Sequence, residues 1–292
     1  MLKQILYTAC VTPFDATGNN IDYQSLEHLL LMQESSGNGI VLMGSTGEGL
    51  SLTDKERREI VTFTCELKLN TEIVIGVPSH NITAALEWLE FCNDLPIQGY
   101  LITSPIYTKP GIIGQTKWFE QILNKSTHPA ILYNIPSRAG VQLYPETVRN
   151  LRDHEYFLAI KDSSGVVDSI IEYKIAAPNT AIYCGDDNMM PSMAIEDAVG
   201  LISVASNAWP KVTRCYVEHC IKGTKIKNKI WWKMCKALFS ASNPIPIKAL
   251  LKDAGIIESD AVRLPLSLED LPSREILLSY NNTMKNWEPN HE

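Results

Sequence analysis

The chain has 292 residues, of which 45% are apolar, and its net charge of −7 is spread along the sequence. This composition is typical of an ordinary globular protein, and it offers no basic–aromatic stripe able to neutralise a phosphate backbone, which excludes nucleic acid as a partner. The first residues lack the apolar core of a signal peptide, and no apolar run approaches the roughly 20 residues that span a bilayer, so we expect a cytoplasmic protein without a membrane partner.

Short β-branched or apolar runs recur about every thirty residues and predict eight strands. Amphipathic stretches with helical spacing, such as the one that carries Leu26, Leu29 and Leu30, fill most of the gaps. Eight strand–helix units with almost continuously apolar strands predict a single α/β domain with a (β/α)₈ barrel. The predicted strands are 5–11, 40–43, 73–77, 100–103, 130–133, 157–160, 181–184 and 201–204.

Local signals mark the ends of several predicted helices. Thr53 and Glu56 have the spacing of a capping box, Pro145 suits the first turn of a helix, and Gly37 is placed to end one. Beyond residue 210 the rhythm changes to helices alone, at 212–221, 229–239, 247–253 and 274–284. We therefore predict one domain over 1–292, with the barrel in 1–210 and the last barrel helix plus a helical appendage in 211–292.

The seven cysteines are scattered, and no two of them form a Cys-x-x-Cys pair. An odd, dispersed set is typical of a reducing compartment, and it lacks the spacing of zinc ligands. Asp186 and Asp187 follow the seventh strand, but neighbouring side chains face opposite ways and no histidine accompanies them. We expect no metal and interpret these two residues as a helix cap and a structural contact.

The sixth predicted strand ends in Ile160-Lys161-Asp162, which places a lysine at the edge where barrel enzymes carry their catalytic groups. Lys161 shares strand parity with the small residue Ala159, so its amine should point into the barrel mouth. Desolvation there would favour the neutral, nucleophilic form of an amine. A lysine that reaches solvent or pairs with Asp162 is the structural alternative.

The fifth predicted strand brings Tyr133 and Arg138 to the same edge. Next to an amine that must lose and regain protons, a phenol is a plausible proton shuttle, although a core tyrosine bonded to the backbone is the alternative. The guanidinium of Arg138 is suited to grip a substrate carboxylate in bidentate fashion, unless it is an ordinary surface residue.

A glycine-rich turn, Gly44-Ser45-Thr46-Gly47-Glu48-Gly49, follows the second predicted strand. It fits neither a Walker loop nor a dinucleotide-binding fingerprint. Its exposed amides and two hydroxyls could cradle a small anion such as a carboxylate. A tight connection between strand and helix would explain the glycines equally well.

Together these segments resemble the dihydrodipicolinate synthase and N-acetylneuraminate lyase superfamily of class I pyruvate aldolases, and within it the dihydrodipicolinate synthase family most closely. The resemblance runs from about residue 8 to residue 266, and several motifs appear in order. They are Thr12-Pro13-Phe14, Gly44-Ser45-Thr46-Gly47-Glu48, Tyr133-Asn134-Ile135-Pro136-Ser137-Arg138, Ile160-Lys161-Asp162, Gly185-Asp186-Asp187 and Asn243-Pro244-Ile245-Pro246.

The resemblance implies a reaction of lysine and diaminopimelate biosynthesis without a cofactor. Lys161 would form an imine with pyruvate, Tyr133 would relay protons, and Thr46 would hold the carboxylate of the keto acid. The enamine would attack L-aspartate 4-semialdehyde, whose carboxylate Arg138 would position. As the ring closes, the amine of this second substrate would displace Lys161.

The resemblance also implies a hydroxyl triad of Ser45, Tyr133 and Tyr107, with Tyr107 supplied by a neighbouring subunit. We therefore expect a homo-oligomer, at least a dimer and commonly a tetramer of two dimers. Gly185 and Ile202 match positions whose backbone lines the substrate pocket.

Two departures from the family pattern concern the chemistry. Ser45 stands where a threonine is usual, which keeps the hydroxyl. Lys161 is followed by Asp162-Ser163-Ser164-Gly165 where many synthases carry Glu-Ala-Thr-Gly, and a similar run occurs among sugar-acid aldolases. An aldolase acting on a 2-keto-3-deoxy sugar acid or on N-acetylneuraminate is therefore the alternative function. A non-catalytic barrel scaffold is a remote one.

A third departure concerns regulation. At positions that bind the feedback inhibitor L-lysine in sensitive members of the family, only Asn81 matches. The chain carries Asp54, Arg57, Ala85 and Ile106 at the others. Because the carboxylate that would receive the ammonium of the inhibitor is missing at Ala85, we predict weak or absent inhibition by L-lysine.

Overall fold

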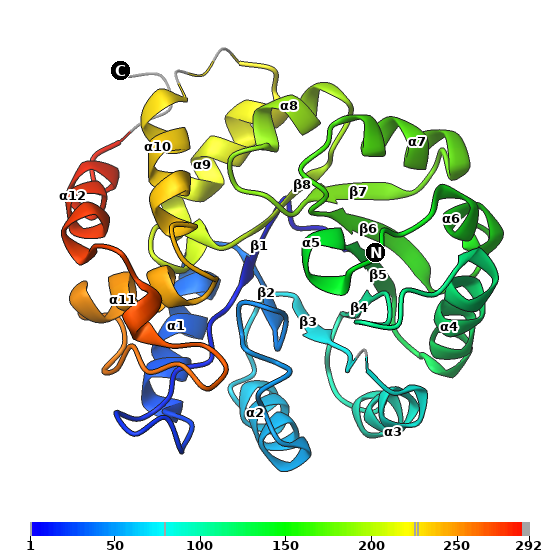
Figure 1. Ribbon diagram of the computed structural model, residues 1–292, viewed down its shortest axis with the longest axis horizontal. Coiled ribbons are helices and arrows are strands. Elements are labelled where there is room, and N and C mark those ends of the chain that lie inside the picture. The colour runs from blue at the N-terminus through cyan, green and yellow to red at the C-terminus, as the bar shows by residue number, and fades with distance from the viewer. Residues whose placement is uncertain (1, 79, 225, 227, 288–292) are drawn as a thin grey trace. The chain divides into compact units, whose positions relative to one another are not determined.

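The computed structural model describes residues 2–78, 80–224, 226 and 228–287. In this part of the chain, eight parallel strands close into a barrel in sequence order, which confirms the predicted fold (Figure 1). The strands are β1 (Leu6–Ala9), β2 (Gly39–Leu42), β3 (Ile73–Gly76), β4 (Gly99–Thr103), β5 (Ala130–Asn134), β6 (Phe157–Asp162), β7 (Ala181–Cys184) and β8 (Gly200–Ser203).

Helices follow the strands and continue after β8, as the amphipathic stretches predicted. In the first half of the chain they are α1 (Tyr23–Ser35), α2 (Asp54–Glu66), α3 (Ile82–Cys92), α4 (Ile112–Lys125), α5 (Pro136–Ala139) and α6 (Pro145–Leu151). In the second half they are α7 (Asp168–Ala176), α8 (Met190–Ile195), η1 (Ala205–Asn207), α9 (Pro210–Ile221), α10 (Lys229–Leu238), α11 (Ile245–Asp253), η2 (Leu268–Asp270) and α12 (Arg274–Met284).

The predicted helix ends have the expected local geometry. The Thr53 hydroxyl accepts from the amide of Glu56 while the Glu56 carboxylate accepts from the amide of Thr53, which is a complete capping box before α2. Pro145 opens α6, and Gly37 follows α1 with φ +70°, a left-handed conformation that glycine adopts at little cost.

By their contacts the residues form two compact units, which are described separately below. The first unit contains the residues up to Lys3 and Ile73–Ile202, and the second contains Gln4–Glu72 and the residues from Ser203 onward. The prediction of one domain, divided at residue 210 into barrel and appendage, stays a prediction.

In the first unit, successive strands place polar side chains in one row. Thr103 of β4 pairs with Tyr133 of β5, Tyr133 pairs with Lys161 of β6, and Lys161 pairs with Tyr183 of β7. Because paired residues of parallel strands lie at the same level of a sheet, two tyrosines flank Lys161 on the adjacent strands. On the outer side of this unit, α4 lies beside α6 (Figure 1).

In the second unit, α12 packs against α10 and α11 (Figure 1). The buried Trp231 of α10 stacks on Tyr216 of α9, with ring centroids 4.0 Å apart, and on Trp287 beyond α12, at 5.5 Å. Burial of these large rings supplies much of the apolar contact in this region. Among the described residues, no helix is both long and apolar enough to cross a bilayer.

Candidate active site

Lys161 is a buried lysine that forms no ion pair with any residue that the structure describes. Its side chain lies at the carboxyl end of β6, the residue is 5% exposed, and Nζ lies 4.2 Å from the centroid of the Tyr133 ring. Among the residues that the structure describes, no carboxylate lies within ion-pair distance of this ammonium. The face of an aromatic ring attracts the ammonium form of the lysine. The ring forms no hydrogen bond with the nitrogen, so it leaves the lone pair of the neutral amine accessible.

Asp162, the neighbour of Lys161 in sequence, has other partners. Its carboxylate is buried and accepts hydrogen bonds from Asn134 Nδ2 at 2.6 Å, from Ser164 Oγ at 2.9 Å and from Ser169 Oγ at 2.5 Å. These donors fix the loop after β6. Lys161 neither pairs with Asp162 nor reaches solvent, so the structural alternative for the lysine is wrong.

Tyr133 is also buried, with 5% of its surface exposed. No hydrogen bond ties its hydroxyl to the backbone in the described part of the chain. The alternative of a core tyrosine satisfied by a carbonyl is therefore not what the structure has. An aromatic hydroxyl without a protein partner, on a ring against the lysine, is suited to exchange protons with a bound molecule.

Gly185 provides the space that the lysine occupies. A Cβ placed ideally on Gly185 would lie 2.9 Å from Lys161 Cε and 2.0 Å from Ser163 Oγ. No larger residue fits without moving one of these side chains, so the glycine allows the β7 backbone to approach the amine closely. Ile202, the other predicted backbone contact, is fully buried in β8 of the same unit.

Asp186 adds a perturbed carboxyl next to this group. Burial raises the pKa of Asp186 to about 6, while the nearby positive charge of Lys161 partly opposes that rise. The interpretation of Asp186 and Asp187 as a helix cap is wrong, because α8 begins at Met190 with Met189 as its N-cap. No cluster of three metal-ligating side chains occurs among the described residues.

Arg138 and Tyr107 lie on the outside of the first unit. Arg138 is an exposed residue of the short helix α5. Tyr107 is 91% exposed and has φ +68°, which is uncommon for a residue with a side chain, and its amide donates to the carbonyl of Ala139 at 3.2 Å. The fold thus holds a tyrosine outward in a strained backbone conformation.

In the second unit, the glycine-rich turn folds tightly back on the end of β2. An ideal Cβ on Gly49 would lie 2.1 Å from the carbonyl oxygen of Met43, so this position requires glycine. Thr46 is 4% exposed and its hydroxyl accepts from Asn243 Nδ2 at 2.9 Å, while Ser45 is half-buried. The predicted anion-binding residues therefore sit in a fixed loop rather than a mobile one.

Two charged residues that the sequence did not single out, Lys248 and Arg263, hold this turn through Glu48. Glu48 accepts from Lys248 Nζ at 2.5 Å and from the amide of Arg263 at 2.9 Å, and both Glu48 and Lys248 are buried. The Arg263 guanidinium also forms two hydrogen bonds to Glu56 at the start of α2. Lys248 lies just after the Asn243-Pro244-Ile245-Pro246 motif. This proximity is the one sequence signal that could have drawn attention to Lys248.

The residues at the predicted inhibitor positions have structural roles of their own. Asn81 is the N-cap of α3 and accepts from the amide of Ala84 at 3.1 Å, Ala85 is fully buried, and Asp54 pairs with Arg58 at 2.8 Å. Weak or absent inhibition by L-lysine stays a prediction.

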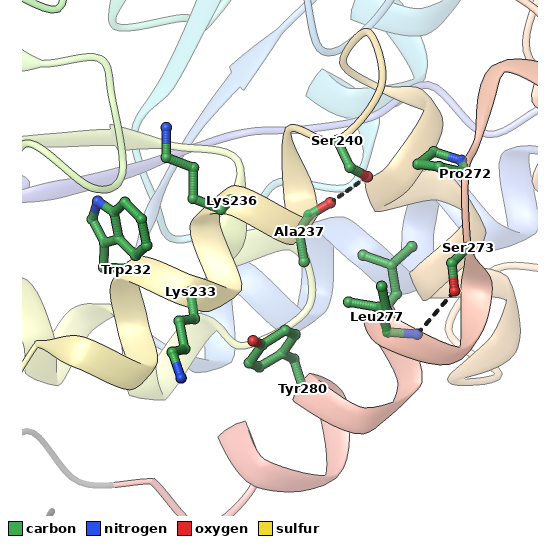
Figure 2. A pocket seen from close by; sticks show the side chains of 10 residues that line it. Trp232, Lys233, Lys236, Ala237, Ser240, Pro272, Ser273, Leu277 and Tyr280 are labelled. Carbon is green, nitrogen blue, oxygen red and sulfur yellow. Dashed lines mark hydrogen bonds between the residues drawn. The ribbon is translucent and has the colours of Figure 1, made fainter.

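A groove of about 380 Å³ lies between α10 and α12 in the second unit (Figure 2). Lys233 and Lys236 extend to opposite sides of α10, away from one another (Figure 2). The hydroxyls of Ser240 and Ser273 are bonded within their own helix ends, to Ala237 and Ile276. Because its polar groups do not converge, the groove lacks the arrangement that catalysis requires.

Comparison with known proteins places these observations in a family. The family model of the dihydrodipicolinate synthetase family matches residues 2–278. The 4-hydroxy-tetrahydrodipicolinate synthase of Wolbachia pipientis subsp. Culex pipiens (strain wPip) is 60% identical over 287 residues, which is 98% of either chain.

Solved structures of similar fold belong to the same family. The 4-hydroxy-tetrahydrodipicolinate synthase of Methylacidiphilum fumariolicum SolV is 30% identical with a TM-score of 0.90, over 97% of each chain. A dihydrodipicolinate synthase of Acinetobacter baumannii, solved in complex with pyruvate, is 28% identical with a TM-score of 0.87, over 97% of this chain and 98% of that one. These matches confirm the resemblance predicted from the motifs and, with it, an enzyme of the lyase type: the chain belongs to the dihydrodipicolinate synthetase family.

Proposed function

We propose that this chain condenses pyruvate with L-aspartate 4-semialdehyde through a Schiff base on Lys161, the 4-hydroxy-tetrahydrodipicolinate synthase reaction of lysine and diaminopimelate biosynthesis. The observation that carries the proposal is the buried amine of Lys161, which has no carboxylate partner and lies 4.2 Å from the Tyr133 ring. A purely structural role does not explain a buried lysine without an ion pair, because an unpaired buried cation destabilises the fold.

The proposed chemistry begins with attack of the neutral Lys161 amine on the keto carbon of pyruvate, followed by loss of water to give the imine. Removal of a proton from the pyruvate methyl group then gives the enamine, in which the nitrogen stores the electron pair. We assign the proton transfers of these steps to the hydroxyl of Tyr133, whose ring centroid lies 4.2 Å from the amine. The imine itself is the electron sink, so the reaction as proposed uses neither metal nor cofactor.

The remaining assignments follow the family motifs. Ser45 and Tyr107 complete the proton relay with Tyr133, Thr46 holds the carboxylate of pyruvate, and Arg138 positions that of the second substrate. The backbones of Gly185 and Ile202 line the pocket. The buried position of Thr46 and the requirement for glycine at position 185 support these roles.

We propose that the enzyme works in the cytoplasm as a homo-oligomer, at least a dimer and commonly a tetramer built from two dimers. A tyrosine that is 91% exposed, in a backbone conformation that side chains rarely adopt, is suited to enter the site of a second copy. Sedimentation of the Tyr107→Phe variant, with its turnover measured in parallel, tests this assignment.

Borohydride reduction in the presence of pyruvate tests the central proposal. The expected result is a protein heavier by one reduced pyruvate, with the modification mapped to Lys161. A wild-type protein that is not modified, or is modified at another lysine, would overturn it. The relatives named as synthases support this reaction over the sugar-acid aldolase that the Asp162-Ser163-Ser164-Gly165 run suggested. Turnover with 2-keto-3-deoxy sugar acids, but not with aspartate semialdehyde, would identify that activity.

A further inference from the structure

Ser163 carries a buried hydroxyl that forms no hydrogen bond with the described part of the chain. The residue is 8% exposed, and its Oγ has no hydrogen-bond partner. Its own backbone is fixed, since its amide donates to the carbonyl of Asn134 at 2.8 Å. A buried hydroxyl without a partner costs about 1–3 kcal/mol relative to one that is bonded, so a functional partner is the natural explanation for its retention.

The hydroxyl lies directly beside the proposed nucleophile. The ideal Cβ of Gly185 would lie 2.0 Å from Ser163 Oγ and 2.9 Å from Lys161 Cε, so these two atoms are separated by at most the sum of the distances, 4.9 Å. Ser163 follows Lys161 by two residues and is the first residue beyond β6, which ends at Asp162. Ser163 therefore lies just past the carboxyl end of β6, the end at which barrel enzymes bind their substrates.

The nearest hydroxyls of the chain behave differently. Ser164 and Ser169 both donate to the buried carboxylate of Asp162, at 2.9 Å and 2.5 Å, and thereby fix the loop after β6. Ser163 takes no part in that network and its side chain is directed towards Gly185 instead. Loop stability therefore does not account for the Ser163 hydroxyl.

We propose that Ser163 is a catalytic residue whose hydroxyl donates a hydrogen bond to the aldehyde oxygen of the second substrate while the carbon–carbon bond forms. This inference rests on the proposed function of Lys161. In that step the enamine carbon bonds to the aldehyde carbon, the nitrogen lone pair restores the C=N bond, and the carbonyl π electrons move onto the aldehyde oxygen. That oxygen then takes a proton from the tyrosine relay, and Ser163 keeps its own.

The position of the hydroxyl favours the aldehyde over pyruvate as its partner. Pyruvate is attached through Lys161 Nζ, and the second substrate must reach the enamine from the open, carboxyl-terminal side of the strands. A donor on that side of the lysine chain meets the oxygen on which negative charge develops. Because the donor is already oriented and has no competing partner, it can stabilise this charge without rearranging.

The Ser163→Ala variant separates this role from a structural one. We expect kcat/KM for aspartate semialdehyde to fall by about 10- to 100-fold, while the rate of borohydride trapping with pyruvate alone stays within about twofold of wild type. The melting temperature should not fall, because the change removes an unsatisfied group. An unchanged kcat/KM, or a trapping rate that falls as much as turnover, would overturn the proposal.

Two further variants complete the test. Thr147 of α6 also has a buried hydroxyl without a partner, so Thr147→Val is a matched control that should leave both rates unchanged. Ser163→Cys keeps the size of the side chain with a weaker donor and should give an intermediate kcat/KM. If wild type is not trapped on Lys161, the proposed function fails. If wild type is trapped but Ser163→Ala turns over normally, only the present inference fails.

Discussion

Two lysines of this chain are buried against aromatic rings, and they differ in their partners. Lys161 lies 4.2 Å from the Tyr133 ring centroid and Lys248 lies 4.0 Å from that of Phe14. Lys248 also bonds to the Glu48 carboxylate at 2.5 Å and to the carbonyl of Ala261 at 2.8 Å. Lys161 has no such acceptors among the described residues. Two buried lysines therefore differ in their partners: Lys248 forms an ion pair that holds a loop, whereas Lys161 forms none with the described residues and is the one that we propose to react.

The electrostatics of the two sites differ accordingly. Burial lowers the pKa of Lys248 to about 8, and the opposite charge of Glu48 limits the fall. Removal of one member of this pair would leave the other buried without a counter-charge. At Lys161 the nearby carboxyl is Asp186, whose own pKa is raised towards neutrality, so it is a weaker counter-charge there.

The largest expected effect is the loss of turnover on replacing Lys161. Lys161→Met keeps the approximate volume and removes the amine, so we expect kcat/KM to fall by at least on the order of a thousandfold, with no borohydride adduct. Stability should be maintained or improved, because an unpaired buried cation is removed. Urea unfolding together with steady-state rates checks both halves. Residual turnover within tenfold of wild type would exclude the Schiff base on Lys161.

Lys248→Met should have the opposite profile and act mainly on stability. It leaves the Glu48 carboxylate buried and unpaired, which costs about 3–5 kcal/mol in unfolding free energy. The double variant Lys248→Met with Glu48→Gln removes both charges and should recover a substantial part of that loss. Denaturant titration of the three variants measures the coupling. If Lys248→Met alone unfolds like wild type, the buried pair does not hold the glycine-rich turn as described.

The contrast between the lysines also shows what the sequence could predict. Strand β6 ends in a lysine after an apolar run, and that local pattern was enough to select Lys161 as the candidate nucleophile. Lys248 lies within the helical segment Ile245–Asp253, where a lysine looks like an ordinary surface residue, and its partner Glu48 is 200 positions away. Periodicity reports which face of an element is apolar, but not which distant charge it meets.

The same limit explains the other differences. All eight strands were predicted to within two residues at each end, because alternation and apolar runs are local properties. The assignment of Asp186 as a helix cap was wrong because the chain makes a further turn before α8 begins at Met190. The unsatisfied hydroxyl of Ser163 depends on what surrounds it in three dimensions, and no sequence pattern reveals that.

Gly185→Ala tests how closely the β7 backbone approaches Lys161. The added methyl would lie 2.0 Å from Ser163 Oγ and 2.9 Å from Lys161 Cε, so both side chains must move. We expect a stability loss of about 1–3 kcal/mol and a borohydride trapping rate reduced by about tenfold or more. Gly111→Ala, where a Cβ meets nothing within 4 Å, is the matched control and should trap normally. Normal trapping by Gly185→Ala would mean that the lysine has more space than described.

The smallest expected effect concerns the weak counter-charge Asp186. Its pKa rises from 3.8 to about 6 on folding, so the folded state binds the proton more tightly, and stability falls as pH rises from about 4 to about 6. Asp186→Asn removes this penalty. It should raise the unfolding free energy by about 1–2 kcal/mol at pH 8, less than the full shift implies because the group is partly exposed, and leave it unchanged at pH 4.

Asp15 supplies the control of opposite sign for that measurement. Hydrogen bonds from Thr17 and Asn20 lower the pKa of Asp15 to about 2, so its contribution to stability is present above pH 4 and is lost as pH falls towards 2. Asp15→Asn should therefore lower stability at pH 8, where Asp186→Asn raises it. If both variants changed stability in the same direction at pH 8, burial would not govern Asp186, and the carboxyl would have to be treated as a full ion-pair partner of Lys161. The distinction between the two buried lysines would then be one of degree.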